Sequence, residues 1–296
     1  MQIKILLQAM RVPFLVLTPV CIFLGVSISF AIQPMINYTM VSIILIGAIA
    51  AHISVNTLNE YYDFKSGLDL ITEKTPFSGG SGALPNHPEI AKSVLSVGIL
   101  SLVLTILTGV YIIFERGMEI MPIGLVGVVL IVTYTQWINR SAFLCLIAPG
   151  LGFGVLMVVG AHVVLIDGHS QFAWLISLVP FLLINNLLLL NQYPDIEADS
   201  SVGRNTFPIV FGIKNSNIIY AVFMLTAYSL IIYFIYSGSI PSLSVIALIP
   251  MSCSLFALSG AIKYAARIGA YPQYLAANVV AAVLTPLLLG ATIVYG

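Results

Sequence analysis

Two short clusters hold most of the acidic residues in the chain, and their composition suits the binding of a cation. Asn59 precedes Asp63 by four residues, just as Asn191 precedes Asp195, and the two pairs are 132 residues apart. We therefore interpret the regions 52–82 and 185–212 as an internal pseudo-repeat. Seven of the eleven carboxylates lie in the two clusters: Glu60, Asp63, Asp69 and Glu73, then Asp195, Glu197 and Asp199.

Helical spacing would place each acidic motif on one face of a helix. Residues i and i+4 share a face, so Asn59 and Asp63 align, and the second motif aligns in the same way if its helix continues past Pro194. No Cys or His converges with these acids, and carboxylates alone favour a hard cation such as Mg²⁺, which also binds substrate phosphates. One cluster would equally fit a solvated helix end, but two matched copies favour a magnesium–diphosphate site.

Basic side chains and a glycine-rich stretch accompany the acids. Lys65 and Lys74 follow the first cluster, Arg204 follows the second, and Arg140 is the only charge on its own connection. The stretch 75–82 offers flexible backbone N–H groups that could bind an anion, although taken alone it also fits a plain loop. These features are consistent with a phosphate ligand.

The composition shows what kind of protein must position these groups. Charged residues make up 7% of the 296 residues, 59% are apolar, and mean hydropathy is +1.07. These values exclude a soluble globular domain and a disordered chain. The balance of 11 basic and 11 acidic residues excludes a basic nucleic-acid binder. The three cysteines lie in apolar runs and are interpreted as buried hydrophobic residues.

Apolar runs of about 20 residues predict membrane-spanning helices. We predict an all-α, polytopic membrane protein with about nine transmembrane helices around a central cavity. The runs are apolar on every face, which excludes the alternating pattern of a transmembrane β-barrel. The predicted spans are 13–32, 41–63, 93–113, 120–137, 142–166, 171–193, 217–236, 240–262 and 273–295.

The basic residues predict the orientation of these spans. With a cytoplasmic N-terminus, every Lys and Arg except Arg116 lies on the cytoplasmic side or at its margin, as the positive-inside rule expects. The two long polar connections, 64–92 and 194–216, then also lie on that side. We therefore expect a single domain over 1–296, in the cytoplasmic membrane, with its site at the cytoplasmic face.

The motifs resemble those of the UbiA superfamily of membrane-embedded prenyltransferases. Their form is closest to the MenA-like branch, which prenylates 1,4-dihydroxy-2-naphthoate in menaquinone biosynthesis. Many relatives carry an arginine after the first motif, whereas here the equivalent stretch contains Lys74 and no arginine. The resemblance rests on Asn59 to Asp69, Asn191-xxx-Asp195-xxx-Asp199, Gly203 to Gly212, Arg11-Val-Pro13 and Tyr134-Thr135 leading to Arg140.

The resemblance implies Mg²⁺-dependent transfer of a polyprenyl group from a polyprenyl diphosphate to a small aromatic acceptor, with no nucleic acid and no protein partner. It implies Mg²⁺ ligands at Asp63, Asp69, Asp195 and Asp199. It implies diphosphate contacts from Asn59, Asn191, Arg11, Lys65, Lys74 and Arg204. It implies catalytic roles for Asp63, Asp195, Arg140 and Tyr134.

Two other functions fit parts of the pattern. A UbiA-type terpene cyclase would ionise the same diphosphate without an acceptor. A secondary transporter would use paired acids for coupling ions, but transporter sites lie near the bilayer midplane, whereas these acids lie at one face. His52, Asn185, Asn186 and Asn278 lie deeper, where they either line an acceptor pocket or join helices. For Asn185 and Asn186 the sequence favours the second role.

Overall fold

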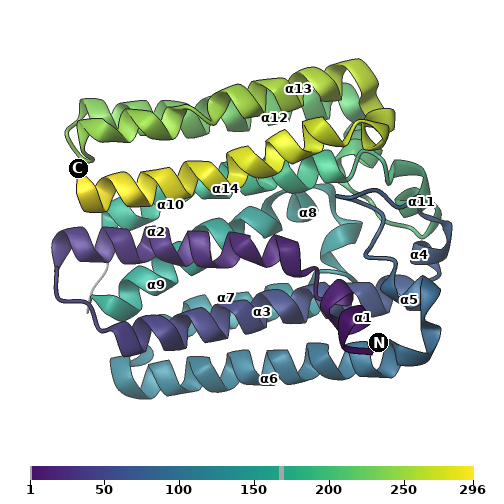
Figure 1. Ribbon diagram of the computed structural model, residues 1–296, viewed down its shortest axis with the longest axis horizontal. Coiled ribbons are helices and arrows are strands. Elements are labelled where there is room, and N and C mark those ends of the chain that lie inside the picture. The colour runs from purple at the N-terminus through teal and green to yellow at the C-terminus, as the bar shows by residue number, and fades with distance from the viewer. Residues whose placement is uncertain (1, 167–169) are drawn as a thin grey trace.

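Long helices running side by side form the computed structural model, which describes residues 2–166 and 170–296 (Figure 1). No strand occurs in these residues. In this described part of the chain, eight helical segments are long and apolar enough to cross a membrane: η1–α2 (Val12–Ile32), α3 (Tyr38–Lys65), η2–α6 (Pro88–Arg116), α8–η5–α9 (Ala142–Leu165), α10 (Gln171–Asn191), α12 (Phe207–Tyr236), η6–α13–η7 (Ser242–Ala270) and α14 (Pro272–Tyr295). The all-helical, membrane-spanning architecture predicted from the sequence is therefore confirmed.

The fourth predicted span, 120–137, is helical but short. It forms the helix Met118–Thr133, which includes α7 (Met121–Thr133). Its 16 residues are fewer than the roughly 20 that cross the hydrocarbon core of a bilayer. After Thr133 the chain forms a turn that leads into the single 3-10 turn η4 (Ile138–Arg140). Of the nine predicted spans, eight thus reach the length of a membrane span among the described residues, whereas the helix Met118–Thr133 is too short.

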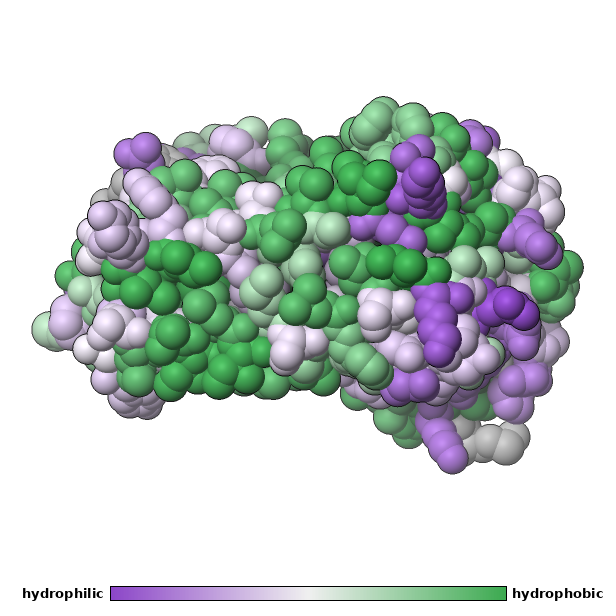
Figure 2. Space-filling model, turned by 90° about the horizontal axis from the view of Figure 1, so that it is seen from above, coloured by the Kyte–Doolittle hydropathy of each residue, from purple (hydrophilic) through white to green (hydrophobic). Residues whose placement is uncertain are grey.

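The short helices and polar connections gather at one end of the bundle. Figure 1 shows α1 (Gln2–Ala9), α4 (Leu68–Ile71), α5 (Ala83–Asn86) and α11 (Ile196–Ser201) at the same end as the N-terminus, opposite the C-terminus. Hydrophilic residues are concentrated at that end, and a broad apolar band covers much of the rest of the visible face (Figure 2). The short helices α4 and α11, which carry Asp69 and Asp199, therefore lie at the same end of the bundle.

Small residues allow the helices to pack closely. A Cβ atom added to Gly98 of α6 would lie 2.9 Å from the Leu58 side chain of α3, and one added to Gly25 of α2 would overlap the Val158 carbonyl of α9. Close approach through small residues is the usual way in which helices pack inside membranes.

Buried amides join the helices further. The Asn185 carbonyl oxygen accepts a hydrogen bond from the Gly150 N–H at 2.6 Å, where the π-helix η5 (Gly150–Met157) begins. Asn186 Nδ2 donates to the Tyr220 carbonyl at 2.9 Å, and Asn278 Nδ2 donates to the Asn186 carbonyl at 3.0 Å. These three amides connect α10 to η5, α12 and α14.

Candidate active site

The first acidic motif lies where α3 ends. Asn59 and Asp63 stand one turn apart in the last two turns of this helix. Gly67, with φ of 81°, adopts the left-handed conformation that reverses the chain into α4, where Asp69 is the second residue. Asp63 and Asp69 are therefore carried by two helices joined through one turn.

The second acidic motif is divided by a turn. Helix α10 ends at Asn191, and Asp195 is the N-cap residue of α11, which contains Asp199. The helix does not continue past Pro194, so the single stripe that was predicted on that condition does not form. Proline has no backbone N–H and its ring clashes with the preceding turn, which explains the break.

Arg204 connects the two motifs. One guanidinium nitrogen forms a very short ion pair with Asp63, and the other donates to Asp199 Oδ1 at 3.0 Å. All three side chains are largely buried. Acids that lie far apart in the sequence thus share one cation, and its charge offsets the repulsion between the carboxylates.

Two further acids of the motifs, Asp69 and Asp195, are available to bind a ligand. In the described part of the chain, Asp69 Oδ2 and Asp195 Oδ1 are both buried and accept no hydrogen bond. Burial raises the pKa of Asp69 to about 8, assisted by the charges of Glu60 and Asp63. Burial likewise raises the pKa of Asp195 to about 7, assisted by the charge of Asp199. Buried, unpartnered carboxylate oxygens of this kind fit a divalent cation.

A cation would need some rearrangement of the acids as they stand. Among the described residues, no group of three or more acidic, His or Cys side chains is arranged to hold a metal ion. Arg204 lies between Asp63 and Asp199. Its positive charge takes the place between the motifs that a cation was predicted to fill.

The glycine-rich stretch binds to both motifs. The Gly79 N–H donates to Asp195 Oδ2 at 3.1 Å, with φ of 75° at Gly79. Gly80, with φ of 72°, lies against Asp69, since an added Cβ would be 2.6 Å from Asp69 Oδ1. Side chains at these positions would strain the backbone, so glycine is required here. The stretch is an ordered part of the site.

Glu60 anchors the same stretch and was absent from the predicted site. Its side chain has no exposed surface. It accepts hydrogen bonds from the Ser81 N–H at 3.1 Å and from the Ser81 hydroxyl, and it lies 3.7 Å from Arg11. The sequence shows that Glu60 belongs to the acidic cluster. It does not show the partners of Glu60, because Ser81 and Arg11 lie in other parts of the chain.

The predicted cations differ in their surroundings. Arg11 has a left-handed backbone with φ of 53°, and its buried Nε has no partner among the described residues. Lys74 lies against Gly82. The Lys65 ammonium lies over the Tyr61 ring, 5.8 Å from its centroid. Arg140 is exposed, and its side chain has no hydrogen-bond or ion-pair partner within residues 2–166 and 170–296.

A cavity of about 370 Å³ extends from the polar end into the bundle. Arg11, Asn59, Asn191 and Tyr134 line its polar end. Asn59 Nδ2 donates to Thr135 Oγ1 at 3.2 Å, and Asn191 Oδ1 is buried without a partner among the described residues. The predicted diphosphate and catalytic side chains at these four positions therefore border one space.

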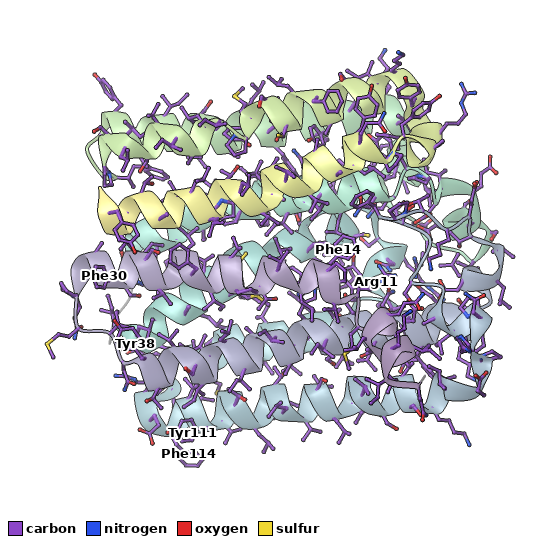
Figure 3. The ribbon with its side chains drawn as sticks, viewed as in Figure 1. Arg11, Phe14, Phe30, Tyr38, Tyr111 and Phe114 are labelled. Atoms are coloured by element: carbon purple, nitrogen blue, oxygen red, sulfur yellow. The ribbon has the colours of Figure 1, made fainter. Side chains whose placement is uncertain are left out.

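The rest of the cavity is long and mainly apolar. It extends along α3 from Asn59 to Ile44, a span of about 22 Å at the usual helical rise of about 1.5 Å per residue. Figure 3 shows Arg11 and Phe14 toward the end of the bundle that carries the polar connections, while Phe30, Tyr38, Tyr111 and Phe114 lie toward the opposite end. A charged group at one end and an apolar chain along the helices would match this shape.

Sequence comparisons identify relatives of the chain. A sequence model of the UbiA prenyltransferase family matches residues 18–274. The chain is 30% identical over 189 residues to 1,4-dihydroxy-2-naphthoate octaprenyltransferase of Bacillus subtilis, and 30% identical over 204 residues to UbiA prenyltransferase domain-containing protein 1 of Dictyostelium discoideum. These matches cover 63% and 64% of this chain, and 60% and 58% of the two relatives.

Solved structures share the fold at low sequence identity. A UbiA homolog from Aeropyrum pernix K1 superposes with a TM-score of 0.72 at 14% identity, covering 96% of this chain and 98% of that one. A UbiA homolog from Archaeoglobus fulgidus bound to GPP and Mg²⁺ gives 0.68 at 15% identity, covering 99% and 100%.

Proposed function

The chain belongs to the UbiA prenyltransferase family, and on that premise we propose that it transfers a polyprenyl group from a polyprenyl diphosphate to a small aromatic acceptor inside the membrane, releasing diphosphate. The acceptor we propose is a quinone precursor such as 1,4-dihydroxy-2-naphthoate. The relative from Bacillus subtilis, named for transfer to this naphthoate, supports the choice.

One observation carries the proposal: a long apolar cavity ends beside the two acidic motifs, at Arg11 and at the two asparagines that precede Asp63 and Asp195 by four residues. Arg11, Asn59 and Asn191 line the mouth of the cavity, while apolar side chains line most of its length. A polyprenyl diphosphate has the same division between a charged head and an apolar tail. The homolog bound to GPP and Mg²⁺ is a relative of this fold with such a ligand.

The carboxylates present fit Mg²⁺ once Asp63 and Asp199 are released from Arg204. Asp69 and Asp195 would contribute the carboxylate oxygens that have no partner within the described residues, and Asp63 and Asp199 would contribute those now paired with Arg204. When bound, Mg²⁺ supplies Lewis-acid stabilisation of the negative charge on the leaving diphosphate.

The basic side chains then stabilise the same leaving group. Arg204, Arg11 and Lys74 carry positive charge beside the acidic motifs, and Asn59 and Asn191 present amides at the cavity mouth. Preorganised charges of this kind stabilise an anion that develops in the transition state. The bond between the prenyl carbon and the diphosphate oxygen breaks, and its electron pair stays on the diphosphate.

The cavity walls direct the transfer. The aromatic carbon of the acceptor forms the new bond to the prenyl carbon and then loses its proton. Tyr134 lines the cavity at this level and offers a π-face to positive charge on the prenyl group. The apolar walls keep water away from that charge. Arg140 is the exposed last residue of η4 and is not one of the residues that line the cavity, and we assign it a supporting positive charge outside the cavity.

We propose that the site faces the cytoplasm. The short helices α4, α5 and α11 lie at the same end as the N-terminus (Figure 1). Most Lys and Arg residues lie on the connections at that end of the predicted spans, which favours a cytoplasmic location.

The test uses the full chain purified in detergent with geranylgeranyl diphosphate, with and without Mg²⁺ and 1,4-dihydroxy-2-naphthoate. We expect diphosphate release to require both additions and to yield a prenylated naphthoate. Metal-dependent release without acceptor, giving a hydrocarbon, would replace the transferase with a terpene cyclase. No release with any chain length or acceptor would contradict prenyl transfer and favour the transporter.

A further inference from the structure

The cavity wall contains a histidine about halfway along its length. His52 lies on α3 two turns deeper than Asn59, and 5% of its surface is exposed. Its Nδ1 is 2.8 Å from the hydroxyl of Thr18 on α2, and its ring packs edge-to-face with the ring of Phe153 at a centroid distance of 4.5 Å. The ring is therefore held between α2 and η5 in one orientation.

The second ring nitrogen of His52 faces the cavity. Its Nε2 has no hydrogen-bond partner among the described residues, and it is not one of their buried, unpartnered atoms either. Since His52 lines the cavity, the open surface at Nε2 is cavity surface. Asn56 lies one turn away on the same face of α3 and also lines the cavity, with its Nδ2 bonded to the Met10 carbonyl.

A polar atom in this position needs a polar ligand. An unpaired polar group away from water costs about 1–3 kcal/mol, and a polyprenyl tail has no atom that could pair with it. A hydroxyl fits best. The Thr18 hydroxyl can donate to Nδ1 or accept from it, so Nε2 is either a donor or an acceptor, and a hydroxyl can serve both.

We propose that His52 Nε2 binds a ring hydroxyl of the aromatic acceptor and thereby positions the acceptor below the diphosphate. His52 is a positioning residue in this assignment, and Thr18 fixes its ring. The inference rests on the proposed prenyl transfer, and it adds the part of the wall that recognises the second substrate.

His52→Phe is the test variant, because phenylalanine keeps the ring and removes both nitrogens. We expect the KM for 1,4-dihydroxy-2-naphthoate to rise about tenfold while the KM for geranylgeranyl diphosphate stays the same. His162→Phe is the matched control. His162 is also buried, its Nδ1 is 3.1 Å from the Ser29 hydroxyl, and it is not one of the residues that line the cavity. We expect both KM values to stay the same in this control.

A second measurement does not depend on how the variant folds. With the wild-type protein, 1-hydroxy-2-naphthoate and 4-hydroxy-2-naphthoate are compared as inhibitors competing with the dihydroxy acceptor. We expect the compound that lacks the hydroxyl bound by His52 to bind about tenfold more weakly than the other, and this difference to vanish in His52→Phe.

The outcomes separate this inference from the proposed function. Acceptor-dependent transfer by the wild type, with an unchanged acceptor KM in His52→Phe, would overturn the inference alone. So would equal binding of the two monohydroxy compounds to the wild type, or a rise in the KM for geranylgeranyl diphosphate only. No acceptor-dependent transfer by the wild type would overturn the proposed function and this inference together.

Discussion

The first acidic motif stands on a continuous helix, whereas the second is divided by a proline turn. Asn59 and Asp63 lie one turn apart on α3, which continues to Lys65. In the second motif, α10 ends at Asn191 and Asp195 begins α11. Two motifs with the same spacing of asparagine and aspartate therefore place their acids in different ways.

One site is assembled from these two unlike halves. The backbone position of Asp63 follows from the geometry of α3. The position of Asp195 also depends on the first half, because the Gly79 N–H donates to it at 3.1 Å. In the other direction, Arg204 from the second half pairs with Asp63. Each half is held by a contact from the other.

The largest expected effect is the loss of an acid from either half. We expect Asp63→Ala or Asp195→Ala to lower the rate of diphosphate release by about 10³-fold or more, since metal and oxyanion stabilisation contribute several kcal/mol to such reactions. Glu197→Ala, an exposed acid of the second motif, is the control and keeps the rate. Near-normal turnover by Asp63→Ala or Asp195→Ala would show that the acids are not used for chemistry.

A second prediction compares the stability that the two motifs contribute. We expect Glu60→Ala to lower the free energy of unfolding by about 3 kcal/mol, because it removes two hydrogen bonds to a buried carboxylate and leaves Arg11 without its partner. Glu197→Ala should change it by less than about 0.5 kcal/mol, as exposed substitutions usually do. Unfolding in detergent measures this free energy for both variants. Equal changes in the two variants would show that Glu60 does not anchor the glycine-rich stretch.

A third prediction concerns pH. Burial raises the pKa of Asp69 to about 8 and that of Asp195 to about 7, so both carboxyls are increasingly protonated as the pH falls. Mg²⁺ must displace these protons, so its affinity falls with decreasing pH. We expect the apparent Kd for Mg²⁺ to rise about tenfold per pH unit between pH 8 and 7, and more steeply below pH 7.

Titration of Mg²⁺ binding at several pH values measures these slopes. In the variant Asp69→Asn, the apparent Kd for Mg²⁺ should no longer change between pH 8 and 7 but should still rise below pH 7. Only Asp195 then holds a proton that Mg²⁺ must displace. An Mg²⁺ affinity that is constant from pH 8 to 6 would contradict the assignment of these two acids.

The smallest expected effect concerns glycines with similar backbones near the two motifs. A methyl group at Gly80 would lie 2.6 Å from Asp69 Oδ1, whereas one at Gly203, with φ of 80°, would have no atom within 4 Å. Both alanine variants bear backbone strain of about 1 kcal/mol. We expect only Gly80→Ala to weaken Mg²⁺ binding as well, by a few-fold. Equal Mg²⁺ affinities in the two variants would show that Asp69 is not held against the loop.

The sequence predicted those features that depend on local periodicity. Apolar runs longer than a membrane span identify the long helices, and the four-residue spacing of Asn59 and Asp63 puts them one turn apart on α3. The break at Pro194 could be stated only as a condition, since proline either kinks or ends a helix. The short α7 was counted as a full span because its apolar run continues into the turn after Thr133.

The remaining features depend on contacts between distant parts of the chain. Glu60 is defined by Ser81 and Arg11, and the pairing of Arg204 with Asp63 joins two connections. No local pattern encodes such pairs. The course of the cavity is equally hidden, because the apolar residues that line it resemble those that face lipid.

A double-variant cycle tests whether the two motifs bind one ligand together. Mg²⁺-dependent binding of geranylgeranyl thiodiphosphate, a slowly cleaved analogue, is measured by calorimetry for the wild type, Asp63→Ala, Asp195→Ala and the double variant. If both acids act on the same metal–diphosphate group, each single variant loses most of the affinity and the double variant loses little more. Independent losses that add in the double variant would contradict a shared site.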